Sequence, residues 1–352
     1  MRRRSDAGLG NGTVVDSSRV PDVELGPSMP TIKDVAQLAG VTVTTVSRVL
    51  NNKGYISDQT RKKVADAVKE LDYVPNEMAR SLLKQRSSII GLIVPTVSHP
   101  FFGELAMHVE YYAYEMGYKI LLCNSHLDSA KERDYLDMLK RHKVDGIIMG
   151  SHTLDVREYQ SLSMPIVTID RKIDDRIPSV CSDNRQGGIL ATRRLIARGC
   201  RKLAMITGSL QLDLLANLRC TAFVAEAEAR GVGHVVIQTS LDVLDYSQYG
   251  ALVDELFAEH PDVDGVFASD VKAAHVLQAC ARLGKAVPRD IKIVGYDDTQ
   301  IASLLTPRLT TVRQPKEAMA KLALEAVVKQ IRGENYSLET ILPVELVDRD
   351  SA

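Results

Sequence analysis

The chain contains 352 residues, of which 45% are hydrophobic and 25% charged, and its formal net charge is −1. This length suggests about two or three domains, and the composition is that of an ordinary globular protein rather than a disordered or fibrous one. No uninterrupted apolar stretch reaches the roughly 18 residues of a membrane span. Because no apolar segment follows the N-terminal arginines, we expect no secretory signal and a cytoplasmic protein without a membrane partner.

The net charge conceals an uneven distribution along the chain. Residues 1–28 contain four Arg and four acidic residues and are neutral. Residues 29–88 contain ten Lys or Arg and six Asp or Glu, a net charge of +4, so the remaining 264 residues carry −5. A basic segment joined to an acidic one is an indication of nucleic-acid contact, and a solvated helical surface is the alternative.

Residues 1–28 lack apolar periodicity and are predicted to be a disordered leader. The next segment, residues 29–74, begins with a capping-box pattern of Thr31 and Asp34, and Gly40 ends the helix that follows. The apolar stripe of this helix consists of Ile32, Val35, Ala36 and Ala39.

A second short helix is expected after the glycine turn, with Thr42 as its cap. Its predicted inward face consists of Val43, Val46, Val49 and Leu50. Polar groups that suit base edges and phosphates in a major groove lie on its other face, namely Thr44, Thr45, Ser47 and Arg48. Ser57 caps a third, supporting helix. The pattern predicts a helix-turn-helix, and an unrelated three-helix bundle is the alternative.

Residues 75–88 combine a short helical pattern with an unusual composition. The helix expected over residues 77–83 is too short to be stable alone in water. Leu82 lies between the cations Arg80 and Lys84. A leucine flanked by phosphate-binding cations fits an element that wedges into a minor groove, so we interpret this segment as a hinge helix and linker.

Three motifs together resemble the lactose-repressor (LacI/GalR) family of bacterial transcription regulators. They are the run Thr31–Asn51, the run Tyr73–Leu82 and the strand-like run Ile90–Pro95. The resemblance implies that Val43, Thr44 and Arg48 enter the major groove and that Leu82 intercalates, whereas Leu83 stands where some members carry a minor-groove lysine. The predicted DNA-binding residues are Thr31, Val43, Thr44, Thr45, Ser47, Arg48, Asn51, Asn76, Ala79, Leu82 and Leu83.

Residues 89–352 alternate short apolar runs with helical stretches, which predicts βαβ units and parallel sheets in two doubly wound lobes. The expected strands are Ile89–Val94, Lys119–Cys123, Asp145–Gly150, Ile166–Ile169, Leu203–Thr207, Val263–Ala268 and Ile291–Gly295. The resemblance implies the type I periplasmic-binding-protein arrangement, an effector domain of two lobes with a ligand cleft. It also implies that the chain crosses between lobes near residues 184–189, near residues 297–299 and close to the C-terminus.

The α/β segment lacks the motifs of the enzymes that share this architecture. It contains no GxGxxG, GxxxxGK[ST] or GxSxG, and its histidines have no metal-binding spacing. The five cysteines are never spaced as CxxC, so we expect reduced thiols without disulfides. We therefore expect no catalytic residues, no cofactor and no metal.

A binding cleft is expected at the carboxyl ends of the parallel strands. Sugars need carboxylates and Arg or Asn donors for their hydroxyls and an aromatic ring for their apolar face. Alignment to the family's effector positions gives the candidates Phe102, Asp170, Arg171, Arg219, Tyr246 and Asp270. Within the family, several stretches are similar to the sucrose-operon repressors of Gram-positive bacteria, but residues 209–217 carry four leucines where the family loop is usually polar.

The combined interpretation is a dimeric transcriptional repressor with a small all-α headpiece and an α/β effector domain. Two copies would bind the half-sites of a pseudo-palindromic double-stranded operator, and a sugar or sugar phosphate would control that binding. No leucine-heptad tail follows Arg349, which favours a homodimer over a tetramer. The alternatives are a sugar receptor with a vestigial headpiece and an α/β enzyme.

Overall fold

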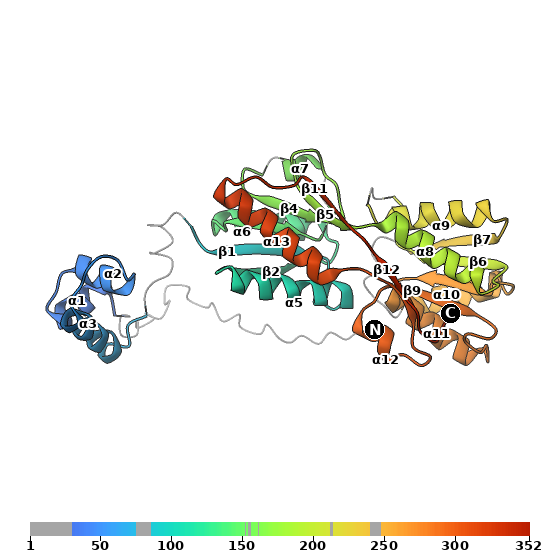
Figure 1. Cartoon of the computed structure of the whole chain (residues 1–352), viewed down its shortest axis with the longest axis horizontal. Coiled ribbons are helices and arrows are strands. Elements are labelled where there is room, and N and C mark those ends of the chain that lie inside the picture. The colour runs from blue at the N-terminus through green and yellow to red at the C-terminus, as the bar shows by residue number, and fades with distance from the viewer. Residues whose placement is uncertain are drawn as a thin grey trace, which may run out of the picture. The chain divides into compact units, whose positions relative to one another are not determined.

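The structure is a computed structural model that describes residues 30–74, 86–151, 153, 156–160, 162–211, 214–239 and 248–352. The chain forms two compact units, Met1–Arg80 and Ser81–Ala352 (Figure 1). The predicted leader and the predicted hinge residues Asn76, Ala79, Leu82 and Leu83 lie outside the described residues. Within the described residues, no helix has the length and apolar character needed to cross a membrane.

Over residues 30–74, the first unit contains three helices, α1 (Ile32–Ala39), α2 (Val43–Leu50) and α3 (Asp58–Glu70). The predicted capping box is present, because the Thr31 N–H donates to Asp34 Oδ2 at 2.7 Å. Gly40 adopts a φ of 65°, which a residue with a side chain rarely adopts, and this turns the chain into α2. Thr42 and Ser57 cap α2 and α3 as predicted.

The core of this unit corrects the predicted inward face of α2. Val35, Val46 and Val64 are fully buried, one from each helix, and Val49 and Leu50 pack against them. Val43 is 40% exposed and is therefore not an inward-facing residue. Val41, from the turn before α2, packs against the cluster instead, so the first residue of α2 is left at the surface.

The second unit contains two six-stranded sheets, which we call the sheets of the first and second lobes. The first sheet has the order β11-β5-β4-β3-β1-β2 and is wholly parallel. Its strands are β1 (Ile89–Val94), β2 (Lys119–Asn124), β3 (Gly146–Met149), β4 (Ile166–Ile169), β5 (Ser179–Ser182) and β11 (Glu339–Leu342).

The second sheet has the order β12-β10-β9-β8-β6-β7, and only its edge strand β12 is antiparallel. Its strands are β6 (Lys202–Thr207), β7 (Gly233–Gln238), β8 (Gly265–Ala268), β9 (Lys292–Asp297), β10 (Thr310–Arg313) and β12 (Glu345–Val347). The predicted two-lobed parallel α/β architecture is confirmed.

Helices cover both faces of each sheet, because alternate strand residues point to opposite faces and both sets are apolar. In β1, Ile90 and Leu92 pack toward α5 and α13, whereas Ile93 packs toward α6. The first lobe contains α5 (Pro100–Glu115), α6 (Ser129–Arg141), α7 (Val156–Gln160) and α13 (Lys316–Arg332). The second lobe contains α8 (Asn184–Ala197), α9 (Asn217–Ala229), α10 (Gln248–Glu259), α11 (Asp270–Arg282) and α12 (Gln300–Leu304).

The chain passes between the lobes three times. The first passage lies between β5 and α8, near the predicted position, and the last lies between β11 and β12, near the C-terminus as predicted. The passage predicted near residues 297–299 is wrong, because α12 follows β9 and buries Ala302 in the second-lobe core. The second passage instead joins β10 to α13, which lies among the first-lobe elements in Figure 1.

Candidate functional site

The carboxyl ends of strands from both sheets meet at a cavity of about 330 Å³. Asp170 follows β4 of the first lobe, and Phe102 lies in the first turn of α5. The second lobe contributes the end of β6, the end of β8 with Ser269, and Tyr296 and Asp297 at the end of β9. Aromatic rings and charged groups thus face one cavity, as expected for a small-molecule site in an open α/β fold.

Arg219 of α9 connects the groups at this cavity. Its Nε donates to Asn184 Oδ1 at 2.5 Å, and its guanidinium carbon lies 3.7 Å from the centroid of the Tyr296 ring. Its Nη2 lies 3.9 Å from Asp170 Oδ2, so the guanidinium of the second lobe faces a carboxylate of the first. Burial raises the pKa of Asp170, and the charge of Arg219 opposes that rise.

Two adjacent glycines of α8 allow this arrangement. A Cβ at Gly188 would lie 2.5 Å from the Arg219 carbonyl oxygen, so only glycine lets α8 and α9 pack this closely. A Cβ at Gly187 would lie 2.5 Å from Cε2 of Tyr296. Gly187 therefore leaves room for the Tyr296 ring, and Gly188 lets α9 approach closely enough for Arg219 to lie over that ring.

Asp297 lies at the cavity in a strained backbone conformation, with a φ of 111°. Gln314 Nε2 donates to its carboxylate at 2.7 Å, and Lys316 Nζ donates to its carbonyl oxygen at 2.6 Å. Burial raises the pKa of the Asp297 carboxyl, and Arg219 opposes the rise. Asp170 also has a positive φ, 55°, and such strained residues cluster at functional sites.

Two further basic side chains line the cavity. Burial lowers the pKa of Lys272 to about 8, with Asp297 opposing the shift and Arg219 adding to it. Burial and the charges of Lys272 and Arg219 lower the pKa of His99 to about 4, so this imidazole is neutral at pH 7. Its Nδ1 accepts a hydrogen bond from the Phe101 N–H at 3.3 Å.

The structure brings three of the six predicted effector residues to the cavity, namely Phe102, Asp170 and Arg219. Arg171 lies over the Tyr159 ring, at 5.5 Å from its centroid, and does not line the cavity. Asp270 is fully buried and bonds to Thr299 and Thr311, so it does not line the cavity either. Tyr246 lies outside the described residues.

Sequence reasoning missed several residues that line the cavity. They are His99, Lys272, Tyr296, Asp297 and Gln314. The pair Asp297-Asp298 directly after an apolar run was the available signal, but it was assigned to a passage between the lobes. Nothing in the local sequence distinguishes Lys272 from a solvated helical lysine.

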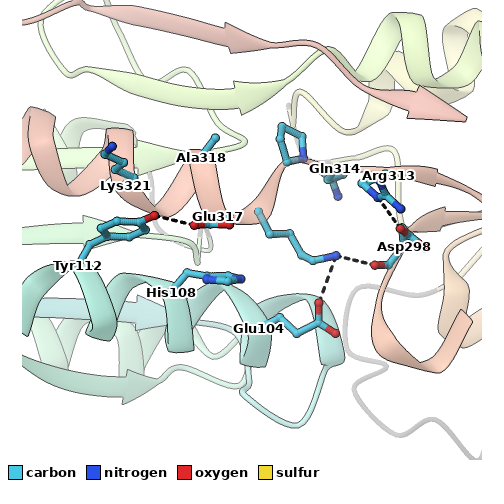
Figure 2. A pocket seen from close by; sticks show the side chains of 11 residues that line it. Glu104, His108, Tyr112, Asp298, Arg313, Gln314, Glu317, Ala318 and Lys321 are labelled. Atoms are coloured by element: carbon cyan, nitrogen blue, oxygen red, sulfur yellow. Dashed lines mark hydrogen bonds and ion pairs between the residues drawn. The ribbon is translucent and has the colours of Figure 1, made fainter. Parts of the chain in front are cut away.

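A second cavity, of about 500 Å³, lies beside the passage from β10 to α13. There Glu104 of α5 accepts a hydrogen bond from the Gln300 N–H at 2.9 Å and lies 3.2 Å from Lys316 Nζ. Figure 2 shows Tyr112 directed at Glu317, with its hydroxyl donating at 2.6 Å, and Arg313 directed at Asp298. Of these contacts, the Glu104–Gln300 hydrogen bond joins the lobes, whereas Tyr112–Glu317 and Glu104–Lys316 join α5 to α13 within the first lobe and Arg313–Asp298 lies within the second.

The described headpiece residues divide into exposed and structural groups. Thr44 and Arg48 are exposed on α2, next to the exposed Val43. The Thr45 hydroxyl is 2.9 Å from that of Thr42, and Asn51 Nδ2 donates to the Ser47 carbonyl at 2.7 Å. Thr31 bonds to Asp34. The polar side chains that α2 presents to solvent are therefore chiefly Thr44 and Arg48.

The five cysteines are all free and buried. Burial raises the pKa of Cys123 to about 11, so this thiol is not ionised at neutral pH. Within the described ranges, no group of three or more His, Cys, Asp or Glu is placed to hold a metal ion.

Two family models match the chain. Residues 31–76 match the bacterial regulatory proteins of the lacI family, and residues 192–352 match a periplasmic binding protein-like domain.

Individual proteins match over nearly the whole length. The chain is 40% identical to the ribose operon repressor of Halalkalibacterium halodurans over 327 residues, which cover 92% of this chain and 97% of that protein. It is 41% identical to the sucrose operon repressor of Pediococcus pentosaceus over 321 residues, covering 90% and 98%. The solved complex of the transcriptional regulator CelR with cellobiose is 30% identical, with a TM-score of 0.68, and the match covers 92% of this chain and 100% of that chain.

Proposed function

Because the chain belongs to the lacI family of bacterial regulatory proteins, we propose that it is a transcriptional repressor that binds operator DNA as a homodimer under the control of a sugar. The observation that carries this proposal is the cavity in which Arg219 of the second lobe faces Asp170 of the first. A ligand bound there touches both lobes and therefore favours one arrangement of them. The protein acts in the cytoplasm and carries out no catalytic step.

The chemistry of the cavity supports a polyhydroxylated effector. Asp170 and Asp297 accept from hydroxyl groups, Arg219 donates to ring or hydroxyl oxygens, and Phe102 offers an apolar face. The names of the relatives, ribose and sucrose operon repressors, and the cellobiose in the similar CelR complex support a sugar.

The headpiece reads DNA through α2. Val43, Thr44 and Arg48 contact base edges in the major groove, and the groups at the ends of α1 and α2 contact phosphates. The two copies in the dimer read half-sites about 34 Å apart, one helical turn. Asn76, Ala79, Leu82 and Leu83 act in the minor groove, where Leu82 opens a base step.

Selection of an operator from random DNA, followed by gel-shift titration, tests the proposal. Arg48→Ala is expected to reduce the preference for the selected operator over random DNA by about tenfold or more, because a base contact is lost. The matched control is Lys62→Ala, which removes an exposed cation from α3 and is expected to weaken both complexes alike. Failure to select any DNA sequence would contradict the repressor function.

A further inference from the structure

We propose that the effector carries an anionic group, a phosphate ester or a carboxylate, and that Lys272 binds this group in the cavity. The proposal rests on the proposed function, since it specifies the chemical class of the sugar that the cavity takes. It also assigns a specificity role to a residue outside the sequence-based candidates.

Lys272 is a buried cation that makes no direct ion pair with the described residues. Its side chain lines the cavity, although the residue is only 9% exposed. Among the described residues, ion pairs within 4.0 Å are formed by the neighbouring cations Arg219 and Lys316 but not by Lys272. Its Nζ lies 5.4 Å from the centroid of the Tyr249 ring, and the charge of Asp297 raises its pKa against the effect of burial.

The other cations near the cavity are already engaged. Arg219 bonds to Asn184, stacks on Tyr296 and faces Asp170. Lys316 bonds to the backbone carbonyls of Asp297 and Asp298 and pairs with Glu104. Among the three described cations, Lys272 is therefore the one whose ammonium has no direct polar partner and can take a ligand group. Burial of an unpaired ammonium is unfavourable, and an arriving anion removes that penalty.

The surroundings of Lys272 also suit an anion. It lies in the first turn of α11, a helix of 13 residues, where backbone N–H groups and the helix dipole favour negative charge. Ser269 caps this helix and lines the cavity, and its hydroxyl does not bond to the helix backbone. The carboxylate of Asp270 is bonded to Thr299 and Thr311 and does not face the cavity.

The carboxylates that do line the cavity are held by other groups. Asn184 Nδ2 lies 3.4 Å from Asp170 Oδ1, and Gln314 donates to Asp297. Burial lowers the pKa of Lys272 only to about 8, so most of the population is protonated at pH 7. The cavity thus offers carboxylates for hydroxyl groups and a separate cation for an anionic substituent.

Calorimetric titration of the full-length protein with matched pairs of probes tests this assignment. The pairs are D-ribose with D-ribose 5-phosphate, D-fructose with D-fructose 6-phosphate, and D-glucose with D-gluconate. In at least one pair we expect the anionic member to bind about tenfold or more tightly than the neutral one, as for a hydrogen bond to a charged group. A preference confined to phosphates or to gluconate identifies the source of the charge.

The decisive variant is Lys272→Met, which keeps the length of the side chain and removes its charge. In this variant we expect the affinities for the anionic and the neutral member of a pair to lie within about twofold of each other. Lys272→Arg is expected to keep the preference for the anionic member. The matched control is Lys285→Met, because Lys285 also lies over an aromatic ring, 5.6 Å from the centroid of Phe257, but does not line the cavity. Lys285→Met should keep the wild-type preference for the anionic member of each pair.

Each outcome separates this proposal from the one on which it rests. Equal binding of both members of every pair overturns the anionic effector and leaves the sugar-controlled repressor intact. A preference that survives in Lys272→Met overturns the role of Lys272. Absence of binding for every probe overturns the sugar effector and the anionic group together.

Discussion

The buried carboxylates Asp270 and Asp297 have different environments within the second lobe. Asp297 lines the cavity, where Gln314 donates to it. Asp270 accepts three hydrogen bonds, from the Thr299 N–H at 2.7 Å, the Thr299 hydroxyl at 2.9 Å and the Thr311 hydroxyl at 2.7 Å. These bonds tie the start of α11 to β10 and to the segment before α12. Asp270 is thus placed to stabilise the second lobe, and Asp297 to meet a ligand.

The ionisation of Asp270 predicts a pH dependence of stability. Burial, and then repulsion by Asp297, raises its pKa from 3.8 to about 7. Between these values the folded state binds more protons than the unfolded state, so this group's contribution to stability decreases as the pH rises. We expect the stability of the wild type relative to Asp270→Asn to fall between about pH 5 and about pH 7. Urea unfolding at several pH values measures this difference in the free energy of unfolding. A difference that increases with pH would contradict the prediction.

Arg219 offers a second test at the level of single residues. Its planar guanidinium bonds to Asn184 while it stacks on Tyr296, and a lysine cannot reproduce both contacts. We expect Arg219→Lys to weaken effector binding by about tenfold or more. The control is Arg230→Lys, where the side chain is 45% exposed and pairs with Glu226, and effector affinity should stay within about twofold there. Equal effects of the two changes in calorimetry would exclude a special role for Arg219.

At the level of elements, seven strands were predictable, including the edge strand β2, whereas β5, β7, β10, β11 and β12 were not. The run Ile89–Val94 was predicted with the observed bounds because a central parallel strand is buried on both faces and is apolar throughout. Strand β5 (Ser179–Ser182) is equally buried but carries two serines. Strands β11 and β12 lie at sheet edges, where half-exposed residues give no continuous apolar run.

The candidate site was also predictable only in part. Phe102, Asp170 and Arg219 came from motif resemblance, which transfers positions that the family shares. The positive φ of Asp297 and the burial of Lys272 arise from tertiary packing, so no local pattern reveals them. The resemblance also gave Asp270, which follows an apolar strand, yet its side chain is turned toward Thr299 and Thr311.

The contacts of α5 and α13 predict an energetic coupling between Glu104 and Lys316. Lys316 Nζ lies 3.2 Å from Glu104 Oε2, and the two side chains are 8% and 18% exposed. A double-mutant cycle with Glu104→Gln and Lys316→Met is expected to give a coupling energy of about 1–3 kcal/mol in urea unfolding, because the pair is partly desolvated. The exposed pair Arg282–Asp254 is the control and should give about 0.5 kcal/mol or less. A coupling energy near zero for the first pair would mean that it does not stabilise the packing of α13 on α5.

At the scale of the whole molecule, the near-neutral net charge is the sum of two opposite modules. Residues 29–88 carry +4 and the 264 residues after them carry −5. The positive charge of residues 29–88 attracts DNA phosphates, whereas the negative charge of the larger unit is repelled by them. Affinity for DNA is therefore expected to come from the headpiece, while the large unit supplies control.

The two activities must be linked reciprocally if the effector controls the repressor. A ligand that changes the affinity for operator by some factor has its own affinity changed by the same factor when operator is bound. Calorimetric titration of an effector into free protein and into the protein–operator complex is therefore expected to give affinities that differ by about 5–150-fold. The Lys316→Met variant is the informative comparison, because Lys316 connects Glu104 of the first lobe to the carbonyls of Asp297 and Asp298. If this connection transmits the signal, the variant binds effector but shows a smaller difference between free and DNA-bound protein. Equal affinities in the wild type would exclude control of DNA binding by that ligand, since a ligand that binds both states alike shifts neither.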